Sequence, residues 1–301
     1  MSTHLVLIHA LSPVHCGTGQ GVGGIDLPIA RERPTGIPLI PGSSLKGVLG
    51  ARGERTDDDH IHVAAFGPDT NEASEHAGAL QFGDAMLLLL PVRSVRGTFA
   101  WVSSPYLLRR FLRDALYCGV ALTALNQEPR DDEAFVTGDR LVVTGTGGAP
   151  EKVVFDDFDF TARKSDEVRI FAEKLAAILL PNQQPAQKHL TERLCFVSDD
   201  VMRVLLRTSM EITARNRINN ETKTVERGAL WTEEALPVES ILYAVLAVTP
   251  VGRGKRKNGE ARRSYTDVEL VQYLRGLMSG GVVQIGGKAT VGRGLCRVEV
   301  L

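Results

Sequence analysis

A glycine-rich segment over residues 15–47 places the strongest constraint on what this chain can fold into. It reads HCGTGQGVGGIDLPIARERPTGIPLIPGSSLKG, with glycines set among a small number of polar side chains. Glycine lacks a Cβ atom, so such backbone can adopt positive φ angles and approach a ligand closely. The segment therefore predicts a loop shaped for backbone contact with a ligand, from which the carboxylate of Asp26 projects.

The last part of this segment has the features of a helix start. We expect a helix over residues 43–55, with Gly42 or Ser43 as its N-cap. Free N–H groups at a helix N-terminus attract anions, and Ser43, Ser44 and Lys46 add two hydroxyls and a positive charge. We interpret the whole segment as a cradle for a phosphate backbone.

The length and charge of the chain limit its class. With 301 residues it can form one large domain or two small ones. The net charge is −1 and the isoelectric point lies near 6.7, which argues against a generally basic nucleic-acid binder. Local basic grooves remain compatible with this balance.

The cysteine pattern and the apolar runs predict a cytoplasmic protein that does not contact a membrane. The cysteines are scattered singly and form no CxxC pair: Cys16, Cys118, Cys195 and Cys296. This spacing supports neither a zinc ribbon nor a disulfide framework, so we expect reduced thiols. The longest apolar run, residues 85–92, is too short to span a bilayer.

Hydrophobic patterning predicts strands and helices in an irregular order. Expected strands cover residues 3–11, 79–92 with a break at 83–84, 96–103, 140–144, 153–160, 194–197, 239–248 and two strands within 283–301. Expected helices start at Pro105 (with an apolar face through Leu116), Asp166, Ser198 and Thr266, and residues 181–187 read as a surface loop. No fixed strand–helix period is present, so we expect an α+β fold with a mixed or antiparallel sheet.

A polar, basic hairpin is expected over residues 213–231. Two strand-like runs flank Asn219-Asn220-Glu221, a typical hairpin turn. Its cations are Arg215, Arg217, Lys223 and Arg227. Without a stripe of large apolar side chains it has no core face, so it should project and contact a partner.

A second basic segment covers residues 252–263. Together with the hairpin and Lys46 it makes three separate cationic segments in a near-neutral chain. Such local concentration of positive charge suggests contacts with a nucleic-acid backbone, although a solvated surface loop is the plainer interpretation.

Two nucleotide-binding motifs are found only in part. Residues 19–24 satisfy GxGxxG, but Pro28 follows too soon for the long helix that a dinucleotide site requires. The GSSLKG and GGKATVG pieces do not meet the phosphate-loop pattern GxxxxGK[ST]. A stand-alone nucleotide-dependent enzyme is therefore not favoured.

Three candidate sites each have two interpretations. The run DDDHIH at residues 57–62 could ligate a metal, but a solvated helix exit is favoured. His15 is either hydrogen-bonded at a strand end or a partner for an RNA phosphate or 2′-hydroxyl. Asp26 is either a turn residue or a carboxylate that holds a divalent cation or accepts a 2′-hydroxyl proton.

Four motifs together resemble the RAMP superfamily of CRISPR proteins. They are the opening cradle, AAFG at residues 64–67, GALWTEEALP at 228–237 and QIGGKATVGRG at 284–294. The chain looks most like the repeated backbone subunits of type III-B (Cmr) effector complexes. The resemblance covers essentially the whole chain.

The resemblance implies a modified ferredoxin-like (RRM-like) palm and a β-hairpin thumb over about residues 213–231. It implies one domain over residues 1–301, with a catalytic loop at about 15–35 and insertions at about 56–78 and 126–192. Copies would stack into a helical filament on a guide crRNA, with other Cmr subunits, and cut complementary target RNA at regular intervals in antiviral defence. Protein would read the guide backbone while base pairing reads the target.

The resemblance also implies roles for particular residues. The catalytic positions fall on Asp26, on His15 and on Glu233 or, failing that, Glu234. Asp26 would also hold Mg²⁺ or another divalent cation. RNA-binding positions fall on Ser43, Ser44, Lys46, Arg215, Arg217, Lys223, Gly287, Lys288 and Arg293.

Two functions are compatible with this pattern. The first is an endoribonuclease subunit in which an unstacked linkage lets a 2′-hydroxyl align with the adjacent phosphorus. The second is a non-catalytic guide-binding filament scaffold, which fits every feature except Asp26 and its glycine loop.

Overall fold

The structure is a computed structural model that describes residues 1–19, 21, 24–53, 61–68, 77–145, 150–249, 263–278 and 281–301. Residues 57–60 of the DDDHIH run and most of the basic segment 252–263 lie outside this part of the chain.

A mixed sheet of thirteen strands forms the centre of the molecule. Its strands are β1 (Ser2–Ala10), β2 (Leu39–Ile40), β3 (Leu80–Phe82), β4 (Ala85–Ser94), β5 (Thr98–Ser103), β6 (Glu133–Val136), β7 (Val142–Val143), β8 (Lys152–Phe155), β9 (Phe158–Lys164), β10 (Leu194–Phe196), β13 (Ile241–Val248), β14 (Val283–Gln284) and β15 (Leu295–Val300). The main path runs β14-β15-β1-β13-β4-β5-β10-β6-β9-β8-β7, with β2 paired to β4 and β3 to β13. Only β5–β10 and β6–β9 are parallel among these pairs. The expected α+β fold with a mixed sheet is confirmed.

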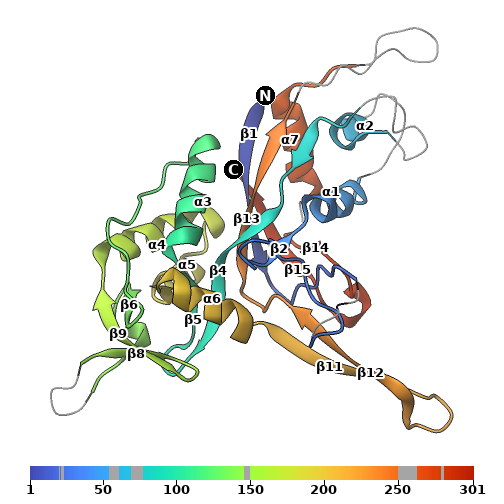
Figure 1. Cartoon of the computed structure of the whole chain (residues 1–301). Coiled ribbons are helices and arrows are strands. Elements are labelled where there is room, and N and C mark those ends of the chain that lie inside the picture. Colours follow the sequence, from blue (N-terminus) through green and yellow to red (C-terminus); the bar gives the residue numbers. More distant parts are fainter. Residues whose placement is uncertain are drawn as a thin grey trace.

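Helices cover both faces of this sheet. They are α1 (Gly42–Gly50), α2 (Ile61–Phe66), α3 (Pro105–Tyr117), α4 (Asp166–Leu179), α5 (Gln184–Thr191), α6 (Asp199–Thr208) and α7 (Asp267–Leu277). Figure 1 places α3, α4 and α5 on one side of β4 and β13, and α1, α2 and α7 on the other. Among the described residues, none of the helices has the length and apolar content to cross a lipid bilayer.

Strand β1 explains why the chain begins with a nearly unbroken apolar run. Successive side chains of a strand point to opposite faces. Leu5 and Leu7 join the core against α3 and α4, whereas Val6 and Ile8 join the core that includes α1 and α7. Because both faces are buried, polar residues have no place in the middle of this strand.

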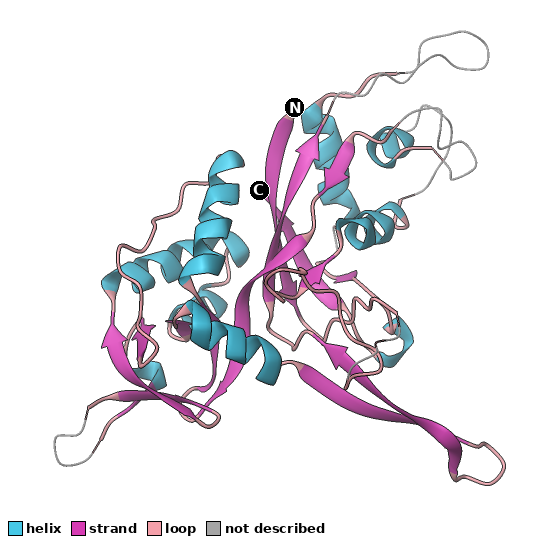
Figure 2. Cartoon of the chain, viewed as in Figure 1, coloured by secondary structure: helices cyan, strands magenta, loops and turns pink. Residues whose placement is uncertain are grey.

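The remaining strands form a hairpin that extends away from the body. Strands β11 (Glu211–Ile218) and β12 (Val225–Ala235) pair with each other and make a separate two-stranded sheet. Figure 2 shows this hairpin projecting beyond the loops at the base of the molecule. Its tip is exposed, and only the last residues of β12 are buried. The expected projecting hairpin is confirmed, with β12 extending beyond Trp231.

The helices that were predicted from a capping residue are confirmed for α6 and α7. Ser198 caps α6 by accepting from the backbone N–H of Val201, and Thr266 and Glu269 form a capping box on α7. On α3, however, Leu116 is 69% exposed, so the expected apolar face ends at Ala115.

Other expectations about local structure were wrong. The segment expected to be a loop at 181–187 contains the start of α5, whose Leu190 is buried and anchors it. The single strand expected over 153–160 is the hairpin β8–β9, which turns at Asp156 with a φ of 44°. Residues 140–144 form a short 3-10 turn followed by β7. Tertiary contacts decided these short segments, for which local propensity is weak.

Candidate functional site

The loop that contains Asp26 is fixed to the edge of β12. The backbone N–H of Leu27 donates to the carbonyl of Thr232 at 3.0 Å, and the N–H of Glu234 donates to the carbonyl of Leu27 at 3.0 Å. Leu27 thereby forms a parallel bridge with Glu233. The loop therefore acts as a short third strand beside the hairpin rather than as a free arm.

Among the residues that the structure describes, Thr232 orients the Asp26 carboxylate. Its Oδ2 accepts hydrogen bonds from the Thr232 backbone N–H at 2.7 Å and from Thr232 Oγ1 at 2.9 Å. The Asp26 N–H donates to Thr232 Oγ1 in return, at 3.0 Å. These bonds, first from the backbone and then from the hydroxyl, lower the pKa of Asp26. The side chain is exposed, and Oδ1 has no partner among the described residues.

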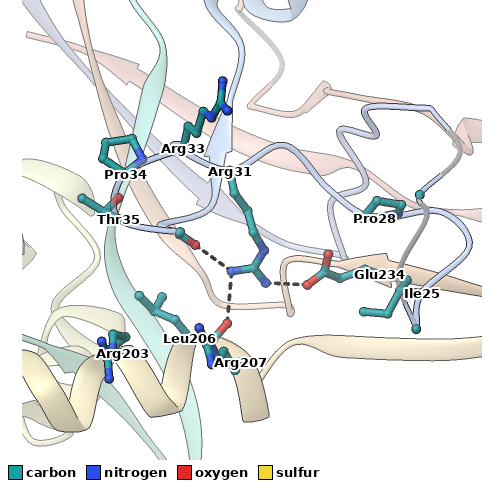
Figure 3. A pocket seen from close by; sticks show the side chains of 13 residues that line it. Ile25, Pro28, Arg31, Arg33, Pro34, Thr35, Arg203, Leu206, Arg207 and Glu234 are labelled. Atoms are coloured by element: carbon teal, nitrogen blue, oxygen red, sulfur yellow. Dashed lines mark hydrogen bonds and ion pairs between the residues drawn. The ribbon is translucent and has the colours of Figure 1, made fainter.

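Glu234, on β12, fixes the Asp26 loop through contacts with Ile29 and Arg31. Its carboxylate is nearly fully buried and pairs with Arg31 Nη2 at 2.5 Å. It also accepts from the backbone N–H of Ile29 at 3.0 Å, while Arg31 donates to the carbonyls of Gly36 and Leu206 (Figure 3). The charge of Glu234 is used to join the loop, β12 and α6, so this carboxylate has a structural function.

Glu233 points to the opposite face of β12 and is surrounded by cations. Lys288 Nζ and Trp231 Nε1 each donate to its Oε1 at 2.8 Å, and Arg215 Nε lies 3.4 Å from its Oε2. Burial of Glu233 opposes its ionisation, but the hydrogen bonds from Lys288 and Trp231 outweigh burial and lower its pKa to about 2. The carboxylate is thus charged and internally paired.

His15 is buried where the end of β1, the end of β12 and the C-terminal glycine turn meet. Its Nδ1 lies 2.6 Å from the carbonyl of Glu234, so Nδ1 carries the hydrogen and Nε2 remains as acceptor in the neutral ring. A Cβ at Gly17 would lie 2.7 Å from this Nε2, and a Cβ at Gly286 (φ 85°) would lie 2.5 Å from the His15 carbonyl. Both glycines are therefore required for this close packing.

The start of α1 differs from expectation. Its N-cap is Pro41 and no side chain caps it, whereas Gly42 or Ser43 was expected; the helix ends at Gly50 rather than at 55. The Gly42 N–H donates to Asp84 Oδ1 at 2.8 Å. A carboxylate therefore already occupies part of the helix N-terminus, which reduces its positive potential for a phosphate.

The structure brings some of the predicted site residues together. Asp26, Leu27, Arg217, Trp231 and Lys288 line one pocket of about 420 Å³. A neighbouring pocket of about 600 Å³ is lined by further predicted residues, namely His15, Ser44, Gly287 and Lys288. Lys288 belongs to both pockets and connects the two groups.

Other predicted residues lie outside these two pockets. Ser43 and Lys46 are on α1 without lining either pocket, and Lys223 is at the exposed hairpin tip. Arg293 is only 6% exposed and bonds to Glu211 and Thr213 at the hairpin base. Their contact with RNA stays a prediction.

A divalent cation would find one available carboxylate here. Within the described ranges, no group of three or more His, Cys, Asp or Glu side chains could hold a metal. Asp26 offers Oδ1. In the buried Glu233, Oε1 accepts from Lys288 and Trp231, whereas Oε2 has no hydrogen-bond partner in the described part of the chain and lies 3.4 Å from Arg215 Nε. Mg²⁺ commonly takes one or two carboxylates, several waters and substrate phosphates, so Asp26 alone fits that ion only together with RNA.

Two residues of the site were given no role from the sequence, although Arg31 is one of the polar groups of the glycine-rich segment. Thr232 orients Asp26, and Arg31 neutralises Glu234. Both occur inside the quoted motifs, but their roles depend on contacts more than 200 positions apart in the chain. A prediction that the backbone of the Asp26 loop pairs with residues 228–237 would have identified Thr232 and Arg31 as site residues.

Comparison with known proteins places the chain in a family. The RAMP superfamily profile matches residues 7–297. The CRISPR system Cmr endoribonuclease Cmr4 of Pyrococcus furiosus is 36% identical over 100% of this chain and 96% of that protein. A crystal structure of oligomeric Cmr4 from the same organism is 30% identical and covers 100% of this chain and 98% of its own, with a TM-score of 0.72.

A more distant structure has the same fold. A chain of the type III-B Cmr-beta complex bound to cognate target RNA, solved by cryo-electron microscopy, has a TM-score of 0.72 at 21% identity and covers 100% of this chain and 97% of its own. The full-length agreement in sequence and structure is decisive: the chain belongs to the RAMP superfamily and, within it, to the Cmr4 family.

Proposed function

We propose that this chain is the backbone subunit of a type III-B, RNA-guided complex and that it cleaves complementary target RNA. It would bind the guide crRNA in repeated copies beside other Cmr subunits, in cytoplasmic antiviral defence. The full-length likeness to a Cmr endoribonuclease and to an oligomeric Cmr4 supports this assignment. In the same proposal the body is a modified ferredoxin-like palm and the β11–β12 hairpin is its thumb.

One observation favours an enzyme over a scaffold. The Asp26 carboxylate is held by Thr232 through one oxygen, while the other has no partner in the described part of the chain and lies beside a pocket lined by Arg217 and Lys288. A scaffold that only contacts phosphates would have no use for an oriented negative charge at this position, since it repels the backbone. The orientation instead suits proton transfer or cation binding.

The chemistry follows from the chain's own groups. With the target unstacked by the hairpin, the O2′ atom attacks the adjacent phosphorus as the bond from that phosphorus to O5′ breaks. This leaves a cyclic phosphate and an O5′ alkoxide, which takes a proton from water to become a 5′-hydroxyl. Asp26 accepts the 2′-hydroxyl proton, and its lowered pKa keeps it ionised at neutral pH. Arg217 pairs with Glu226 at 3.6 Å, and Lys288 pairs with Glu233. Both cations line the pocket and would turn part of their positive charge toward the phosphate. A divalent cation held by Asp26 would add Lewis-acid stabilisation of the developing charge.

The test is Asp26→Asn in a reconstituted complex. The amide keeps the shape but loses the base, so regularly spaced target fragments should fall by about 10²–10⁴-fold while guide and target binding persist. Thr208→Val, on the exposed surface of α6, is a control that should cut normally. An unchanged fragment yield from the complex that carries Asp26→Asn would leave only the scaffold function.

A further inference from the structure

A second, larger pocket lies on the Glu234 face of β12 and has no assigned function (Figure 3). Its volume is about 700 Å³, and the residues of the Asp26 loop form one wall while α6 forms the other. The 420 Å³ pocket at Asp26 borders Trp231, which points to the other face of the strand. Gly21 lines both pockets, so the two are neighbours across one loop.

The charges in this pocket do not balance. Its described lining holds four arginines and one carboxylate, and Arg31 is neutralised by its ion pair with Glu234. The other three, Arg33, Arg203 and Arg207, are exposed, and their side chains make no hydrogen bond or ion pair with a described residue. Arg203 and Arg207 lie on α6, and Arg33 lies on the opposite wall with its guanidinium directed away from α6 (Figure 3). The described lining therefore has an excess of positive charge, which favours an anion.

The arrangement of the arginines suits an extended polyanion. Arg203 and Arg207 are four residues apart, so they share one face of α6 and are separated by about 6 Å along its axis. Figure 3 shows both on this helix, with Arg33 on the loop across the pocket. Guanidinium groups bind phosphate in a bidentate manner, and two of them one helical turn apart can contact consecutive phosphates.

We propose that this pocket binds the ribose-phosphate backbone of the target strand on the side of the Asp26 loop away from Lys288. The inference rests on the proposed function, because a strand that is cut at Asp26 must continue past one side of this loop. An RNA backbone is favoured over a protein partner because the open groups are cations rather than a large apolar anchor. The contacts are to phosphate, so they should be independent of target sequence.

The test measures target binding, not cutting, with Arg203→Ala/Arg207→Ala in complexes that also have Asp26→Asn. Guide loading should remain normal. Target affinity should fall at least about tenfold, since each lost charge-assisted bond is worth about a factor of ten. The slope of log affinity against log salt should become shallower by about 0.7 for each phosphate contact removed.

A matched control removes the same charge elsewhere. Arg93→Ala/Arg96→Ala changes two exposed arginines near the β4–β5 turn and should leave target affinity and salt slope unchanged. If the complex with intact arginines does not bind a guided target, the proposed function itself fails.

Two results would overturn the inference while leaving the proposed function intact. The first is equal target affinity and salt slope for the Arg203/Arg207 variant and the control. The second is a variant that assembles fewer copies but binds target normally per copy, which would assign the arginines to an acidic protein surface.

Discussion

Two neighbouring parts of the molecule hold their carboxylates in opposite ways. The exposed rim is the Asp26 loop with Thr232, and the buried base is Glu233 and Glu234 at the end of β12. At the rim, the described groups bonded to the Asp26 carboxylate are the neutral groups of Thr232, and one oxygen has no described partner. At the base, Glu233 and Glu234 are 2% and 3% exposed and are paired with Lys288, Arg215 and Arg31. A buried carboxylate that is neutralised by partly exposed cations stabilises structure, whereas one oriented by neutral donors keeps its charge for a ligand.

This contrast gives different functions to carboxylates that lie close together, because Glu233 and Glu234 directly follow the Thr232 that orients Asp26. Glu233 and Glu234 were expected to include the third catalytic position. The structure gives both an internal partner, and their chemical role in the proposed reaction stays a prediction. The difference between rim and base can be tested by substitutions that affect either stability or activity.

The largest expected effect on stability is at the base. Glu234→Gln removes the partner of Arg31 and leaves its guanidinium partly buried without a counter-charge, which should cost about 3–5 kcal/mol. The free energy of unfolding in urea measures this. A loss below about 1 kcal/mol would show that the base is not held by this pair.

A pH titration should reveal the other buried carboxylate. The pKa of Glu233 is about 2 in the folded chain against an ordinary value of 4.5. A lowered folded pKa stabilises the protein above pH 4.5, and this contribution, on the order of 3 kcal/mol, is lost as pH falls from 4.5 toward 2. Urea midpoints for wild type and Glu233→Gln should therefore converge over this range. A constant difference between the two would contradict the assignment.

For target cutting, the orientation of the Asp26 carboxylate by Thr232 should matter less than the charge of that carboxylate. Thr232→Val removes one of the two bonds to Asp26 Oδ2 but leaves the backbone bond. We expect cutting to fall about tenfold. The pH at which cutting reaches half its maximum should rise, because the hydroxyl helps to lower the pKa of Asp26. Thr232→Ser should restore both; a purely structural role would leave the pH profile in place.

The smallest effect on stability is expected for Asp26→Asn. The side chain is exposed and makes no ion pair with a described residue, so the free energy of unfolding should change by at most about 0.5 kcal/mol. Thermal or urea unfolding checks this. A large loss would make Asp26 a structural residue and remove the contrast between rim and base.

Much of the framework was predictable because its signals are local. The apolar runs of β1, β4 and β13, the caps of α6 and α7, and the polar hairpin follow from patterns within about ten residues. The resemblance to the RAMP superfamily was likewise readable from motifs and is confirmed along the chain. The short helix α5 was not predicted from the sequence, because a single buried side chain, Leu190, anchors it to the core.

The sequence by itself determined the glycine-rich loop, the exposed hairpin, the family and the position of Asp26. Only the tertiary structure decided what each charge does. Asp26 is next to Thr232, and Arg31 next to Glu234, through contacts that join distant parts of the chain. A carboxylate becomes a structural or a reactive group according to its burial and its partners, and both are set by packing rather than by neighbouring residues in the sequence.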